Sequence, residues 1–216
     1  MIRTIDNVEI KQQISAKLLE VGAIKLNLAT PFKWSSGWNS PIYCDNRLAL
    51  SYPQIRTFIK EQLAVQIKMN FPKVEAIAGV ATAGIPQGAL VADALDLPFI
   101  YVRAKAKGHG MGNMIEGKIT KGQKVVLVED LVSTGGSSLK AAEALLAADF
   151  EVLGMLAIFT YGFEVAANNF ERENIELICL SDYTTLIDLS LADGKITQEE
   201  VAMLKSWRSD PANWNV

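Results

Sequence analysis

Short apolar segments recur through the middle of the chain and alternate with alanine-rich stretches. Five of them cover residues 74–80, 98–102, 124–129, 151–159 and 175–180. Each is nearly continuous in apolar residues, which is typical of strands buried on both faces of a parallel sheet. The alanine-rich stretches between most of them suit helices. The pattern predicts an α/β fold with a mainly parallel central sheet flanked by helices.

The segments on either side of this region follow other patterns. Apolar residues at helical spacing, behind a cap at Asp6 or Asn7, predict a helix near the N-terminus. Residues 27–46 lack that spacing and carry prolines and paired serines, so we expect turns and short strands there. A further helix is predicted to begin near Ser51 and Pro53.

We expect residues 1–216 to form a single domain. A small hood is expected mainly from about residues 1–50. The C-terminal stretch of about residues 182–208 predicts two short helices, broken at Asp193–Gly194 and packed on the core.

Charge and cysteine content exclude several classes of partner. With 21 basic and 24 acidic residues the net charge is -3, so we expect neither nucleic acid nor a membrane as a partner. Cys44 and Cys179 lack metal-site spacing and favour two reduced thiols. The N-terminus lacks the apolar segment of a signal peptide, and the longest apolar run, residues 152–163, is too short to span a bilayer. A soluble cytoplasmic protein is expected.

The third apolar segment leads directly into polar chemistry. Residues 124–138 read KVVLVEDLVSTGGSS, which places Glu129 and Asp130 at the carboxyl end of a strand and a helix start near Ser137. Glycines let the backbone approach a phosphate closely, and a helix N-terminus presents free N–H donors. The segment therefore predicts a cradle for a phosphate monoester.

Two common nucleotide motifs are absent from this segment. It contains neither GxxxxGK[ST] nor GxGxxG, which excludes a P-loop and a dinucleotide fingerprint. The two carboxylates can instead accept hydrogen bonds from ribose hydroxyls or orient the waters of a Mg²⁺ ion, so the expected ligand is a sugar phosphate. An acidic turn that only caps the helix is the alternative, and it accounts for Ser133 or Thr134 alone.

The stretch VVLVEDLVSTGGSS closely resembles the 5-phosphoribosyl-1-pyrophosphate (PRPP) signature of type I phosphoribosyltransferases. The resemblance implies the type I phosphoribosyltransferase fold and Mg²⁺ as cofactor. The ion would be bound through PRPP and waters near the two acids, without direct protein ligands. The resemblance also implies that Asp130 is catalytic and that PRPP contacts run along the signature: Glu129, Asp130, Leu131, Val132, Ser133, Thr134, Gly135, Gly136 and Ser137.

A basic, glycine-containing loop follows the second apolar segment. YVRAKAKGHGMGNMIEG places Arg103, Lys105, Lys107 and His109 at every second position, so an extended loop projects these cations to one side. A solvated surface loop is the alternative, but the chain is acidic overall and its only histidine lies here. The loop resembles the catalytic loop of the orotate phosphoribosyltransferase family, which closes over pyrophosphate in the neighbouring subunit. This implies a homodimer in which residues 103–117 reach the other active site.

The same resemblance assigns roles within that loop. Lys107 is the implied catalytic lysine, His109 its companion and Arg103 a pyrophosphate ligand. The family often has a lysine where Ala104 stands, and whether Lys105 replaces it stays open. A third loop, GVATAGIPQGA at residues 79–89, resembles the family's pyrophosphate-binding loop and implies PRPP contacts at Thr82, Ala83 and Gly84.

The segment FKWSSGWNSPIYCDNR resembles the family's hood around a Ser-Gly-x-x-Ser-Pro core. Orotate is a flat anionic pyrimidine that needs an aromatic or peptide face and a cation for its carboxylate, which Tyr43 and Arg47 can supply. Tyr161 stands near the place of an arginine that helps many relatives hold the base. The implied orotate contacts are Ser133, Tyr43, Arg47 and Tyr161, and either Arg47 or the Tyr161 region binds the carboxylate. Core packing is at least an equal alternative for each of Trp34, Trp38 and Tyr43.

The implied reaction transfers the 5-phosphoribosyl group from PRPP to N1 of orotate, as in pyrimidine biosynthesis. One alternative is a phosphoribosyltransferase for a purine or for uracil, which the basic loop with His109 disfavours. The other is a protein that senses PRPP without catalysis, which would be expected to carry a DNA-binding domain or a basic surface. The acidic chain shows neither.

Overall fold

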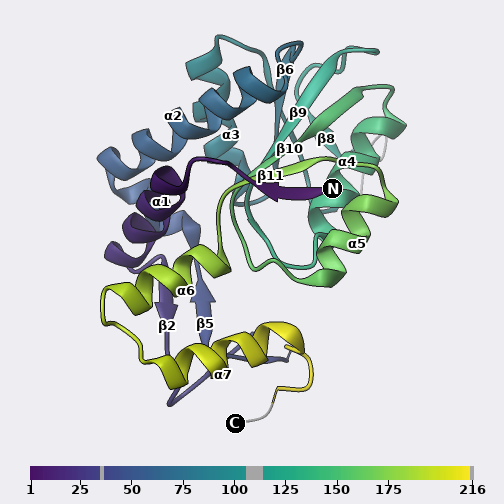
Figure 1. Ribbon diagram of the computed structural model, residues 1–216. Helices are drawn as coiled ribbons and strands as arrows, with labels where there is room; N and C mark the ends of the chain where they lie inside the picture. Colours follow the sequence, from purple (N-terminus) through teal and green to yellow (C-terminus); the bar gives the residue numbers. More distant parts are fainter. Residues whose placement is uncertain (35–36, 106–113, 215–216) are drawn as a thin grey trace.

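The computed structural model describes residues 1–34, 37–105 and 114–214. Helices cover both faces of a central seven-stranded sheet with the order β1-β11-β10-β9-β6-β7-β8 (Figure 1). All neighbouring strands pair in parallel except β7 and β8. The strands are β1 (Ile2–Thr4), β6 (Ala76–Val80), β7 (Phe99–Val102), β8 (Ile115–Glu116), β9 (Lys124–Val132), β10 (Glu151–Thr160) and β11 (Leu177–Asp182). The predicted α/β fold is confirmed.

The central strand β9 shows why the apolar segments are continuous. Val126 and Val128 belong to the core cluster under α1, α2 and α3. Val125 and Leu127 belong to the cluster under α4 and α5 on the opposite face. Successive side chains of a strand point to opposite faces, so a strand covered on both sides must be apolar at every position. Burial on both faces thus fixes β9 at the centre.

The helices begin close to where the sequence predicted. Asn7 caps α1 by accepting a hydrogen bond from the Ile10 N–H, and Pro53 occupies the first turn of α2. The two expected C-terminal helices are present as α6 and α7. The helices are α1 (Val8–Glu20), α2 (Pro53–Asn70), α3 (Gly84–Leu95), α4 (Gly136–Ala147), α5 (Glu164–Arg172), α6 (Tyr183–Ala192) and α7 (Gln198–Ser209).

The hood was expected from about residues 1–50, but β1 belongs to the main sheet, so the name is used from here on for residues 24–51. These residues form two small antiparallel sheets outside the main one. In the first, β2 (Ile24–Leu26) pairs with β5 (Ile42–Cys44). In the second, β3 (Phe32–Lys33) pairs with β4 (Asn39–Ser40). A 3-10 segment, η1 (Asn46–Ser51), then returns the chain to the core. Helices α6 and α7 lie beside the hood (Figure 1), and the buried Trp207 of α7 donates a hydrogen bond to the Asn39 carbonyl oxygen.

Two local features differ from expectation. Strand β9 continues to Val132, so Asp130 lies two residues and Glu129 three residues before its end. The extension is paired with β10, where Thr160 lies opposite Val132. Strands β1 and β8 were not predicted, because two or three residues at a sheet edge give too little pattern.

Among the described residues, no helix combines the length and the apolar character that crossing a bilayer requires.

Candidate active site

The acidic pair is built into the centre of the sheet. Glu129 is 5% exposed, and its carboxylate accepts hydrogen bonds from the Ser138 hydroxyl at 3.1 Å and the Asp130 N–H at 3.0 Å. Burial, and then the neighbouring Asp130 charge, raise the pKa of Glu129 well above its ordinary value. Burial likewise raises the pKa of Asp130. A cationic ligand would relieve this repulsion, so the pair favours positive charge nearby.

A residue of the hood holds the backbone beside these acids. The Asn46 amide donates to the Asp130 carbonyl oxygen at 2.7 Å and accepts from the Cys44 thiol at 3.2 Å. Asn46 is only 1% exposed. The sequence analysis missed this residue, whose only signal was a polar side chain within a segment expected to fold as turns. Its two hydrogen bonds couple the hood to the acidic pair.

The loop after β9 leads into α4 with its backbone donors free of side-chain caps. Gly135 has φ +82°, and a Cβ added there would lie 2.7 Å from the Phe170 ring. Asn169 on α5 donates to the Thr134 carbonyl oxygen at 3.0 Å and so fixes the loop from outside. No side chain caps α4, whereas α1, α6 and α7 are capped by Asn7, Asp182 and Thr197. The N-terminus of α4 can therefore bind an anion.

The loop after β6 reaches the same edge of the sheet. A Cβ on Gly84 would lie 2.4 Å from the Val128 carbonyl oxygen, so only glycine lets α3 begin this close to β9. The peptide bond between Ala81 and Thr82 is cis. Helix α3 also begins without a side-chain cap, at Ala83. Two uncapped helix ends thus lie on either side of the acidic pair.

Arg103, the first residue of the basic loop, lies close to the starts of α3 and α4. Its N–H donates to the Met114 carbonyl oxygen at 2.8 Å, and its guanidinium lies 3.4 Å from the Glu116 carboxylate. A cavity of about 70 Å³ is lined by residues of all three loops and by Lys140, a cation that the sequence analysis missed. The lining residues are Val80, Ala81, Val102, Arg103, Ala104, Met114, Ser137, Lys140 and Ala141. Lys105 is exposed, and Lys107 and His109 lie outside the described residues.

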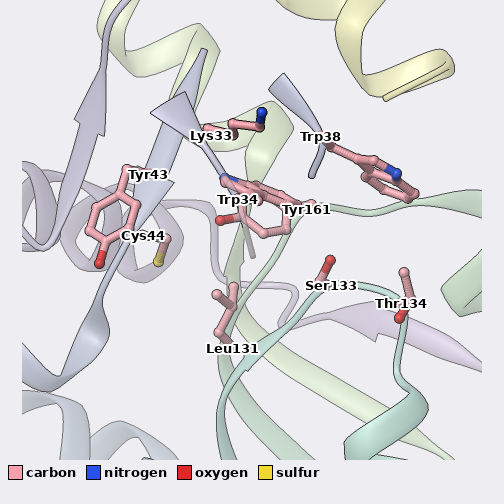
Figure 2. A pocket seen from close by; sticks show the side chains of 9 residues that line it. All are labelled: Lys33, Trp34, Trp38, Tyr43, Cys44, Leu131, Ser133, Thr134 and Tyr161. Atoms are coloured by element: carbon pink, nitrogen blue, oxygen red, sulfur yellow. The ribbon is translucent and has the colours of Figure 1, made fainter. Parts of the chain in front are cut away.

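A larger pocket of about 550 Å³ lies between the hood and the loop after β9 (Figure 2). One wall is aromatic: the Trp34 and Tyr161 rings are 5.0 Å apart, and Tyr161 stacks on Phe163 at 5.4 Å. Figure 2 shows Lys33 on the hood side and Ser133 and Thr134 on the opposite side. The lining residues are Lys33, Trp34, Trp38, Tyr43, Cys44, Leu131, Ser133, Thr134 and Tyr161. A flat ring fits such a pocket.

Of the four predicted orotate contacts, three line the pocket and one does not. Ser133, Tyr43 and Tyr161 all line the pocket. Arg47 is not among the lining residues, because its guanidinium makes two hydrogen bonds to Asp45, at 2.6 and 2.9 Å. These hydrogen bonds lower the pKa of the Asp45 carboxyl. Lys33 lines the pocket, although the sequence analysis did not single it out.

Comparison with known proteins agrees with this geometry. The phosphoribosyl transferase domain family matches residues 53–184. An orotate phosphoribosyltransferase of Cytophaga hutchinsonii is 55% identical over 94% of this chain and 97% of its own. This chain belongs to the orotate phosphoribosyltransferase family. The Listeria innocua member is 54% identical over 95% of this chain and 98% of its own. The crystal structure of the Aeropyrum pernix orotate phosphoribosyltransferase, 30% identical, superposes with a TM-score of 0.73 over 85% of this chain and 99% of its own.

The arrangement of the loops and the pocket indicates which ligands the site can hold together. An anion site, an acidic pair and an aromatic pocket meet at the carboxyl edge of β9, and Ser133 and Thr134 belong to both the phosphate loop and the pocket wall. A phosphorylated sugar and a flat base can therefore be held side by side. The segment from Glu129 to Ser137, which resembles the PRPP signature, lies at this edge.

Proposed function

We propose that this chain transfers the 5-phosphoribosyl group of PRPP to N1 of orotate, giving orotidine 5'-monophosphate and pyrophosphate in de novo pyrimidine biosynthesis. One observation carries the proposal: the phosphate loop and the aromatic pocket share Ser133 and Thr134. A base in the pocket thus lies next to a sugar phosphate on α4. We name orotate as the base because this chain belongs to the orotate phosphoribosyltransferase family.

The PRPP contacts follow from the three loops. The 5'-phosphate binds the loop from Leu131 to Ser137 at the start of α4, where backbone donors and the helix dipole favour an anion. The pyrophosphate binds the loop at Thr82, Ala83 and Gly84, with Arg103, Lys105 and the catalytic residues Lys107 and His109 closing over it. Arg103 lines the cavity that joins these loops, which supports its role.

The acidic pair fits Mg²⁺ held indirectly. Among the residues that the structure describes, no group of three His, Cys, Asp or Glu side chains can hold a metal ion. Two buried carboxylates beside a phosphate site instead suit an ion that keeps water and substrate oxygens as ligands. Glu129 and Asp130 would hold it through waters, and the bound ion supplies positive charge for the departing pyrophosphate.

Catalysis is proposed to rest on charge and positioning. Breaking the anomeric bond builds positive charge on the ribose, which the Asp130 and Glu129 carboxylates stabilise. Negative charge builds on pyrophosphate, which the cations of the basic loop stabilise. Orotate reacts as its anion, so no side chain has to remove a proton. Ser133, Tyr43 and Tyr161 are proposed to orient the base, and closure of the loop excludes water.

We further propose a cytoplasmic homodimer of single-domain chains in which residues 103–117 complete the neighbouring site. If the loop acts in trans, mixing Lys107→Ala chains with Asp130→Asn chains regenerates some sites with both residues intact. At equal mixing we expect activity well above that of either variant alone, measured as the orotate consumption rate. Activity of the mixture equal to the average of the two variants would rule out the shared site.

The base specificity is tested with the purified protein, PRPP and Mg²⁺. Orotate, uracil, hypoxanthine and adenine are supplied separately, and base consumption is followed by absorbance. We expect consumption of orotate alone. Consumption of a different base would retain the phosphate loop and refute the assignment of the pocket, whereas PRPP binding without turnover of any base would favour a sensor.

A further inference from the structure

The pocket contains a single positively charged side chain among its described lining residues. Lys33 lies on β3, opposite Asn39 on β4, and lines the cavity together with the aromatic wall. No carboxylate in residues 1–34, 37–105 and 114–214 forms an ion pair with it. A cation beside an aromatic pocket is placed to attract a planar anion.

Arg47, the cation expected from the sequence, is already engaged. Besides the two guanidinium bonds to Asp45, the Arg47 N–H donates to the same carboxylate at 3.2 Å. Its side chain is 60% exposed, and Arg47 is not among the residues that line the pocket. The hydrogen bonds from Arg47 lower the pKa of the Asp45 carboxyl, so the positive charge of Arg47 already has an anionic partner outside the pocket lining.

Tyr161, the other expected contact, stays uncharged. Burial raises the pKa of its hydroxyl well above the ordinary value, so the group is a neutral donor at any physiological pH. Tyr161 is 2% exposed; its ring stacks on Phe163 and is tilted against Trp34. Tyr161 therefore shapes the wall of the pocket, and the charge for an anionic base must come from another residue.

We propose that Lys33 binds the carboxylate of the pyrimidine and thereby selects orotate over uracil, an inference that rests on the proposed function. The carboxyl group is on the ring carbon next to N1. With N1 facing the ribose above β9, the carboxylate extends along the pocket wall. Lys33 lines the pocket from the hood side, opposite Ser133 and Thr134 (Figure 2), and its flexible four-carbon stem allows the ammonium group to turn toward that carboxylate.

The test compares orotate with its 6-carboxamide, which has nearly the same shape and no charge. The wild type is assayed first for orotate turnover. In Lys33→Met we expect the orotate KM to rise about 10- to 100-fold, the range of a lost charge-assisted hydrogen bond. The inhibition constant of the carboxamide should change by less than threefold. Lys33→Arg should regain much of the orotate affinity.

Two further variants make the outcome decisive. Lys73→Met removes an exposed charge from the turn between α2 and β6 and controls for the loss of a surface lysine. Arg47→Met tests the rival cation. Equal losses for orotate and the carboxamide in Lys33→Met, or a selective loss of orotate affinity in Arg47→Met, would overturn the inference. A wild type that consumes another base but not orotate would overturn the proposed function itself.

Discussion

Trp207 connects the C-terminal helix to the base pocket, so its removal should weaken both stability and orotate binding. The side chain is fully buried and lies edge-on to Trp34 at 5.7 Å and to Tyr161 at 5.8 Å. It also contacts Phe163 and Tyr183, each at 5.4 Å, and its Nε1–H donates to the Asn39 carbonyl oxygen at 3.1 Å.

The expected magnitude follows from these contacts. Replacing a buried tryptophan by alanine costs about 3–5 kcal/mol, which is a large part of the roughly 5–15 kcal/mol that stabilises a typical domain. Trp207→Phe keeps a ring in the cluster and loses the hydrogen bond, worth about 0.5–1.5 kcal/mol. We therefore expect Trp207→Ala to be much less stable than Trp207→Phe.

The assay is urea denaturation combined with steady-state kinetics. Met203→Ala, on the same helix but 40% exposed, serves as the control and should change stability by less than about 0.5 kcal/mol. In Trp207→Phe the orotate KM should rise more than the PRPP KM, because Trp207 supports the aromatic wall and not the phosphate loop. A Trp207→Ala protein as stable as Met203→Ala, or equal rises of both KM values in Trp207→Phe, would refute this reasoning.

Three further predictions concern the acidic pair and its surroundings. Gly135→Ala should lose at least about 1–2 kcal/mol of stability and raise the PRPP KM, because alanine at φ +82° is strained and its Cβ would meet Phe170; an unchanged PRPP KM would contradict this. Asn46→Ala should cost about 1–3 kcal/mol in a denaturation assay by leaving the Asp130 carbonyl oxygen without its hydrogen bond; a neutral effect would show that water replaces the amide. The pKa of Glu129 is raised in the folded state. Above a pH of about 4.5 the unfolded state therefore releases a proton that the folded state still holds. The stability of the wild type should fall as the pH rises from there toward the folded pKa. Glu129→Gln should lack that part of the decline in urea midpoints, and parallel pH profiles would argue against a raised pKa.

Much of the scaffold could be predicted because burial on both faces leaves a plain pattern. Residues 125–128 are apolar at every position, and the structure places them in the central strand. The cap of α1 at Asn7 and the start of α2 at Pro53 were equally readable. The short edge strands β1 and β8 could not be predicted, since three and two residues give too little pattern, and the partner of β1 lies at the other end of the chain.

The local structure of the candidate site was predictable where one contiguous segment builds it. The turn through the loop from Ser133 to Ser137 and the helix that follows could be predicted from the sequence, and phosphate binding there stays a prediction. Lys33 and Asn46 lie in the irregular hood, where no periodicity says which side chain points inward. Their positions emerge only when β3 and η1 are folded against β9. The Asp45 carboxylate beside Arg47 was visible in the sequence, but its bidentate pairing was not.

The most direct test of the account is ³¹P NMR of the protein with PRPP and Mg²⁺, with and without orotate. We predict that the resonances of PRPP are replaced by those of free pyrophosphate and of the 5'-phosphate of orotidine 5'-monophosphate only with orotate present, in a one-to-one ratio with the orotate consumed. Pyrophosphate release that is independent of orotate, or no release with it, would contradict phosphoribosyl transfer at the junction of the phosphate loop and the aromatic pocket.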